Sequence, residues 1–149
     1  MKPNKNLTAL ISLWVNRAVA LLLVALLFLL PAILDWYTGF RFLSETEQLV
    51  ITVSFYLCVV VIGYALWNVD NLLRSVLADR VFIRKNVQAI RRIQWCCALV
   101  ALITGVTCFA YLPLIFLVII MAFLCLMISV VANVMDAAVS IREENDLTI

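Results

Sequence analysis

Few residues of this sequence have side chains that perform chemistry in other proteins. Histidine is absent, which removes Ser–His and Cys–His nucleophile pairs and the HExxH metal motif together. Glycine-rich phosphate-binding loops are missing, and no acidic residue lies deep within an apolar run. We therefore predict no catalytic residue, no bound cofactor and no metal site, and hence a protein that is not an enzyme.

The cysteines are the remaining reactive side chains, and all of them lie inside or at the edge of apolar runs. None shows the paired spacing of a zinc site. The simplest interpretation is that they are small apolar side chains packed between helices, with disulfide or metal roles as the alternatives. The five are Cys58, Cys96, Cys97, Cys108 and Cys125.

The apolar content is far too high for a water-soluble domain. Hydrophobic residues make up 66% of the 149-residue chain and charged residues only 13%, whereas soluble domains are about half apolar and a quarter charged. Four apolar runs are long enough to cross about 30 Å of hydrocarbon as helices. We place these spans at about residues 10–34, 49–67, 95–111 and 114–132, in one all-α membrane domain that forms a four-helix bundle.

The distribution of basic residues predicts the orientation of the spans. The N-terminal segment carries Lys2, Lys5 and Arg17, and the segment between spans two and three carries six basic residues. The loop between spans one and two has only Arg41. Because basic loops stay in the cytoplasm, we predict that the N-terminus, the hairpin 68–94 and the tail 133–149 are cytoplasmic. Arg17 then reaches the headgroups beside Trp14, with a buried functional charge as the alternative.

Helical periodicity continues beyond the predicted spans. Apolar residues recur at helical spacing over residues 69–77, so the second helix is expected to extend two to three turns into the cytoplasm. After a turn near residues 79–85 a similar stripe resumes, and Asn86 is a candidate N-cap. Polar residues of one face extend the fourth helix to about Glu144. Spans two, three and four are therefore predicted to have cytoplasmic helical extensions.

Small residues line one face of span three and one face of span four. The Leu112-Pro113 corner makes these spans antiparallel neighbours, and small side chains let membrane helices approach closely. We predict that the two faces form a packing seam, with a dimerisation face as the alternative. The residues are Ala98, Ala101, Gly105 and Cys108 on span three and Ala122, Cys125, Ser129 and Ala132 on span four.

Two cytoplasmic motifs resemble those of a known family. The chain closes with REENDLTI at 142–149, and the hairpin contains VFIRKNV at 81–87 followed by IRRI at 90–93. Both are similar to motifs of a bacterial family of small four-span membrane proteins, catalogued as domain of unknown function 2975. Val81 stands where the family motif usually has proline. The resemblance implies the bacterial cytoplasmic (inner) membrane.

The resemblance also implies a partner, because members of this family are often encoded beside a small helix-turn-helix regulator of the Cro/C1 type. We therefore expect membrane lipids around the spans and a small cytoplasmic regulator as the partner, without direct nucleic-acid binding by this chain. A homo-oligomer is a further option. The candidate partner-binding residues are Phe82, Arg84, Asn86, Arg91, Arg92, Arg142, Glu143, Glu144, Asn145, Asp146, Leu147 and Ile149.

Three functions stay open at this point. The first is binding or sequestration of that regulator, the second is a small oligomeric channel or transporter, and the third is a lipid-interacting structural protein. The basic tip of the hairpin has two interpretations as well. It holds the loop inside against anionic lipid, or it docks an acidic partner.

Overall fold

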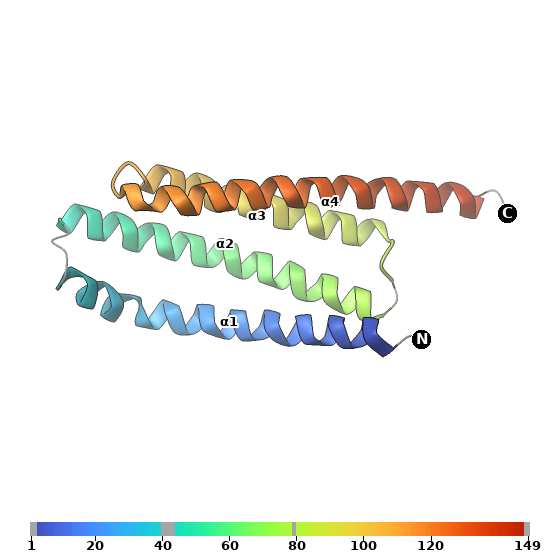
Figure 1. Cartoon of the computed structure of the whole chain (residues 1–149), viewed down its shortest axis with the longest axis horizontal. Coiled ribbons are helices and arrows are strands. Elements are labelled where there is room, and N and C mark those ends of the chain that lie inside the picture. Colours follow the sequence, from blue (N-terminus) through green and yellow to red (C-terminus); the bar gives the residue numbers. More distant parts are fainter. Residues whose placement is uncertain (1–2, 40–43, 79, 148–149) are drawn as a thin grey trace.

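The computed structural model describes residues 3–39, 44–78 and 80–147, which form four long α-helices. In chain order these are α1 (Pro3–Thr38), α2 (Glu45–Leu77), α3 (Arg84–Thr107) and α4 (Ile115–Leu147), with a short 3-10 helix η1 (Leu112–Leu114) before α4. The helices lie side by side and alternate in direction, so that α1 begins and α4 ends at the same end (Figure 1). All four are long and apolar enough to cross a membrane. The chain is therefore a multi-pass membrane protein, as its composition predicts.

Each helix packs against its neighbours in sequence, α1 on α2, α2 on α3 and α3 on α4. Among the described residues, the backbone of α1 does not closely approach that of α3 or α4, and α1 lies across α2 from them (Figure 1). The four-helix arrangement is thus open along the side between α1 and α4. Of the described helices α3 buries the largest share of its residues, and its Val100 is 3% and its Thr107 2% exposed.

Large apolar side chains cover the outer faces of the helices. Phe28 is 76% exposed, Val60 73% and Phe116 73%. Continuous apolar surface of this extent is unfavourable in water and marks contact with an apolar phase. Lipid is the environment in which these faces are stable.

The helices are longer than the apolar runs. With 33 residues each, α2 and α4 measure about 50 Å at 1.5 Å per residue, against about 30 Å of hydrocarbon. The helix α2 continues past Trp67 to Leu77, and α4 continues past Ala132 to Leu147. Both continuations agree with the periodicity of the sequence.

A capping box begins α2 ahead of the apolar run. The backbone N–H of Ser44 donates to Oε2 of Glu47 (2.9 Å), and the N–H of Glu47 donates to Oγ of Ser44 (3.3 Å). This reciprocal pair satisfies two donors that a helix start leaves unpaired. The capping box therefore lets α2 begin at Glu45, in polar residues that precede the apolar run.

The helical part of span three is shorter than the predicted span, which reaches residue 111. The helix α3 ends at Thr107, whose carbonyl oxygen accepts from the N–H groups of Ala110 (3.0 Å) and Tyr111 (2.9 Å). Tyr111 is extended, with φ −138° and ψ 94°, and Pro113 has no N–H with which to continue a helical ladder. The helix therefore stops earlier, and η1 completes a corner that is wider than Leu112-Pro113.

The helices α3 and α4 are neighbours as predicted, and Sγ of Cys125 on α4 donates to the Gln94 carbonyl of α3 at 3.7 Å, but two residues of the predicted small-residue seam make no close contact. A Cβ built on Gly105 meets no atom within 4 Å, and Ala122 is exposed. The buried face of α3 instead carries Val100, Thr104 and Thr107, and Gly105 lies about 100° around the helix from Thr104. Of the other predicted seam residues, Ala98, Ala101, Cys108, Cys125 and Ser129 are half-buried, and Ala132 is buried.

Candidate functional site

Side-chain hydrogen bonds to backbone carbonyl groups stabilise the turn between α2 and α3. Nδ2 of Asn86 donates to the carbonyl oxygens of Arg80 and Val81, both at 2.8 Å, and the hydroxyl of Ser75 donates to the Arg80 carbonyl at 3.0 Å. The predicted N-cap role of Asn86 is therefore wrong, since Ile83 occupies that position. At 3% exposed, Asn86 holds the turn and offers a partner almost no surface.

Four charged residues link the start of α3 to the end of α4. Nη2 of Arg84 donates to Oε2 of Glu143 at 2.8 Å, and Nη1 of Arg84 lies 3.6 Å from Oδ1 of Asp136. Nη2 of Arg91 donates to Oδ2 of Asp136 at 2.8 Å. The basic pair and the acidic pair are each spaced by seven residues, two helical turns. Because the helices are antiparallel and the spacing is equal, Arg84 pairs with Glu143 while Arg91 pairs with Asp136.

Buried aliphatic side chains lie on the same stretches of α3 and α4 as these ion pairs. Val87 is 5% and Ile90 8% exposed on α3, while on α4 Ala132 is 1% and Val139 2% exposed. Val139 falls between the two acidic residues in the sequence, so it faces α3 with them. We call these four residues the terminal seam.

The terminal seam contributes more stability than the ion pairs above it. The side chains of Arg84, Glu143 and Asp136 are 59%, 49% and 34% exposed, and water screens exposed ion pairs so that each contributes little. Full burial of one valine in water contributes roughly 1.5–3 kcal/mol. The charges therefore select the register of α4 on α3, whereas the aliphatic residues stabilise the contact. Sequence reasoning did not select Asp136, although its seven-residue spacing from Glu143 was a usable signal.

The last turns of α4 extend beyond the start of α3 (Figure 1). In the last two turns of α4 Ile141 is 60% exposed, and the predicted partner-binding residues Arg142, Glu144 and Asn145 are exposed as well. Two more of that set are exposed near the α2–α3 turn, Phe82 at 44% and Arg92. The side chains of Asp146 and Leu147 and the whole of Ile149 lie outside the described residues.

A second polar cluster joins α1 to α2. Oδ2 of Asp70 accepts from Nε of Arg74 at 2.7 Å, and Oδ1 of Asp70 lies 3.6 Å from Nε of Arg17. Nδ2 of Asn16 donates to the Leu66 carbonyl at 3.2 Å. Arg17 is thus an ion-pair partner whose side chain is 49% exposed. Sequence reasoning considered Arg17 alone and missed its contact with Asp70.

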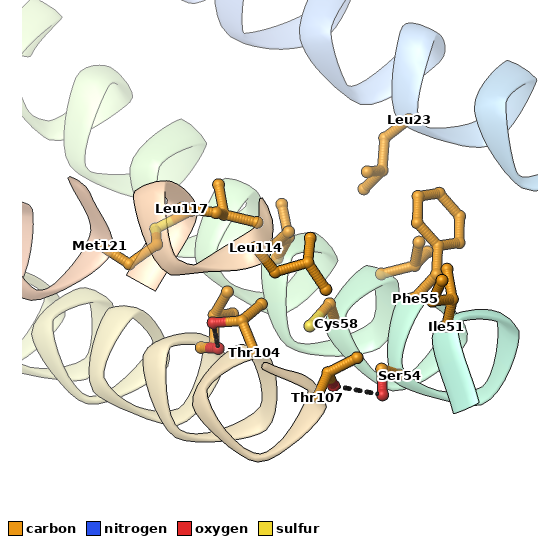
Figure 2. Close-up of a pocket in the computed structure, with 13 residues that line it drawn as sticks. Leu23, Ile51, Ser54, Phe55, Cys58, Thr104, Thr107, Leu114, Leu117 and Met121 are labelled. Atoms are coloured by element: carbon orange, nitrogen blue, oxygen red, sulfur yellow. Dashed lines mark hydrogen bonds between the residues drawn. The ribbon is translucent and has the colours of Figure 1, made fainter. Parts of the chain in front are cut away.

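An apolar cavity of about 220 Å³ lies between the spans and is lined by residues of all four helices (Figure 2). Leu23 faces it from α1 and Leu117 from α4. Its hydroxyl groups are already hydrogen-bonded, because Thr104 donates to the Val100 carbonyl at 2.7 Å and Thr107 lies 2.6 Å from Oγ of Ser54. The cavity therefore suits an apolar occupant.

The cysteines are free thiols. Within the described ranges, no three His, Cys, Asp or Glu residues are grouped so that they could hold a metal ion. The features that remain for function in those ranges are the charged end of the bundle, the α1–α2 polar cluster and the apolar cavity.

Comparison with known proteins supports the resemblance of the hairpin motif and the closing motif. The profile of one family, described as "Protein of unknown function (DUF2975)", matches residues 8–149. Both motifs lie inside the matched range. No curated protein and no solved structure matches the chain.

Proposed function

Since the chain belongs to the DUF2975 family of proteins of unknown function, we propose a function from its own geometry and charge. In this proposal the chain is a non-enzymatic protein of the bacterial cytoplasmic membrane, and it binds a small soluble protein at the charged end of the bundle. The basic residues of the hairpin favour the cytoplasmic side for this end. The extensions of α2, α3 and α4 then stand in the cytoplasm, together with both termini.

The exposed face of the last turns of α4 is the observation that carries this proposal. It presents Ile141 between polar neighbours, and helix ends fray where no tertiary packing holds them. An aliphatic side chain on a helix with charged flanks is the arrangement that docks into the groove of a partner. A bound partner would cover Ile141 and stabilise the last turns of α4.

The mixture of charges favours a protein over nucleic acid as the ligand. Lys85 and Arg92 are exposed at this end, and a purely basic surface would attract phosphates. However, the carboxylates of Asp136 and Glu143 lie on the same face as Arg84, where they would repel a phosphate backbone. The family resemblance supports a small helix-turn-helix regulator as this partner, which the chain would hold at the membrane.

Co-purification tests the proposal. The helix-turn-helix protein encoded beside the gene is co-expressed with the tagged membrane protein, and its recovery is measured at matched membrane levels. Ile141→Asp places a charge on the docking side chain and is expected to lower recovery at least tenfold. Thr46→Asp adds the same charge at the opposite end of the bundle and is expected to leave recovery unchanged. Equal recovery with both variants, or none with the unmodified protein, would contradict the proposal.

No observation favours the channel alternative. In the described part of the spans, the hydroxyl groups of Thr52, Thr104 and Thr107 all bond carbonyl oxygens of their own helices. A conducting path requires polar groups that face a shared lumen. We therefore propose partner binding alone.

A further inference from the structure

A groove of about 330 Å³ runs between α1 and α2, with a charged end and apolar walls. Arg17 and Asp70 lie at the charged end. Farther along the groove the walls are formed by aliphatic residues and by Gly63, which has no side chain. Leu23 lines this groove and also the apolar cavity of Figure 2, so the two hollows adjoin at that residue.

The charged end of the groove has an excess of positive charge. Arg17 and Arg74 both contact Asp70, and two cations with one anion leave a formal charge of +1. A guanidinium has five N–H donors, and the contact of Arg17 is an ion pair at 3.6 Å. Since its side chain is 49% exposed, Arg17 can also bind an anionic group in the groove, and phosphate suits its planar donors.

The groove lies at the depth at which a lipid phosphate meets its acyl chains. Trp14 is 65% and Trp67 71% exposed beside it, and exposed tryptophans of membrane helices gather at the headgroup boundary. At 1.5 Å per residue, Leu23 lies about 9 Å deeper than Arg17, and Ile62 about 12 Å deeper than Asp70. Both distances fall within one leaflet, about 15 Å of hydrocarbon.

We propose that this groove is a binding site for one phospholipid. The phosphate binds Arg17, and one acyl chain passes Gly63 and Leu23 into the apolar cavity. The bilayer supplies this ligand directly, because the arrangement is open between α1 and α4. A free phosphate would leave the apolar walls unfilled, whereas an acyl chain covers them. This site is independent of the regulator proposed for the cytoplasmic end.

Two glycines provide a matched pair of variants. A Cβ at Gly63 and a Cβ at Gly105 both meet nothing within 4 Å, so a side chain can begin at either position without a clash of its Cβ. Gly63 lines the groove, whereas Gly105 lines neither hollow. Gly63→Leu therefore obstructs the acyl chain, and Gly105→Leu is its control. For the phosphate, Arg17→Gln removes the cation, and Arg80→Gln removes an exposed cation of the α2–α3 turn that does not line the groove.

Native mass spectrometry of the protein extracted from bacterial membranes in mild detergent measures retained phospholipid. We expect one retained phospholipid per chain, a loss of at least fivefold with Gly63→Leu and with Arg17→Gln, and no change with the two controls. Circular dichroism and gel filtration identify any variant that fails to fold. If Arg17→Gln fails to fold, the comparison of Gly63→Leu with Gly105→Leu decides the result.

Photo-crosslinking locates the lipid. A phospholipid with a diazirine in its acyl chain is expected to label α2 around Ile62 in the unmodified protein and to lose that label with Gly63→Leu. Retention of lipid by the Gly63→Leu variant at the unmodified level would overturn the proposal. Labelling spread equally over outward residues such as Phe116, or no retained lipid in the unmodified protein, would overturn it as well.

Discussion

Val139→Ala tests whether the terminal seam or the ion pairs hold the end of α4 on α3. Val139 is 2% exposed, and the substitution removes two methyl groups from a buried position. At about 0.8 kcal/mol per buried carbon, the loss is about 1.6 kcal/mol before any cavity term is added. Arg84→Gln removes two ion pairs whose side chains are largely exposed, and water screens such pairs so that they contribute little. The valine substitution should therefore loosen the end of α4 more.

Amide hydrogen exchange of residues 136–145, measured in lipid nanodiscs, reports local opening of this segment. Because 1.4 kcal/mol corresponds to a tenfold change in an equilibrium constant, a loss of 1.6 kcal/mol accelerates exchange roughly 15-fold. Ile141→Ala is the control, because Ile141 is 60% exposed. The substitution therefore removes apolar surface that makes few packing contacts. Its exchange should stay within about twofold of the unmodified protein.

Two results would refute this reasoning. If Arg84→Gln accelerates exchange more than Val139→Ala, the ion pairs stabilise the end of α4 more than Val139 does. The small contribution that is usual for exposed ion pairs then does not apply to them. If none of these amides exchanges in the unmodified protein on the timescale at which surface helices do, the segment lies in hydrocarbon. The cytoplasmic placement of the extensions would then be wrong.

Three further outcomes are expected. A cysteine replacing Glu45 should react with an impermeant reagent added outside whole cells, whereas one replacing Lys85 should not, and the reverse pattern would invert the topology. Gly105→Leu should leave thermal unfolding in detergent unchanged within about 0.5 kcal/mol, because its Cβ meets open space, and a clear drop would restore the small-residue seam. Asn86→Ala should destabilise the α2–α3 turn by about 1–3 kcal/mol through the loss of two hydrogen bonds, measured by exchange of residues 80–90. The exposed neighbour Gln88 provides the control, Gln88→Ala, and equal exchange in both variants would exclude the structural role of Asn86.

The sequence alone determined the number of membrane helices and their approximate positions. Burial in lipid acts on each segment by itself, since a backbone in hydrocarbon must satisfy its own hydrogen bonds and so becomes helical. The continuation of α2 to Leu77 was predictable for a similar reason, because an amphipathic stripe needs only its own periodicity. The closing motif and the hairpin motif were sufficient to predict the family that the profile match establishes.

Contacts between helices were decided only by the tertiary structure. Whether Gly105 meets a neighbour depends on the rotation of α3, and a change of 100° moves a residue from the seam to open space. Asparagine is a common N-cap residue, but the path of the turn brings the side-chain amide of Asn86 within hydrogen-bonding distance of two carbonyl oxygens instead. Arg17 and Asp70 are far apart in the chain, and the packing of α1 on α2 makes them a pair. Such contacts depend on the register and rotation of whole helices, which the composition of a single segment does not specify.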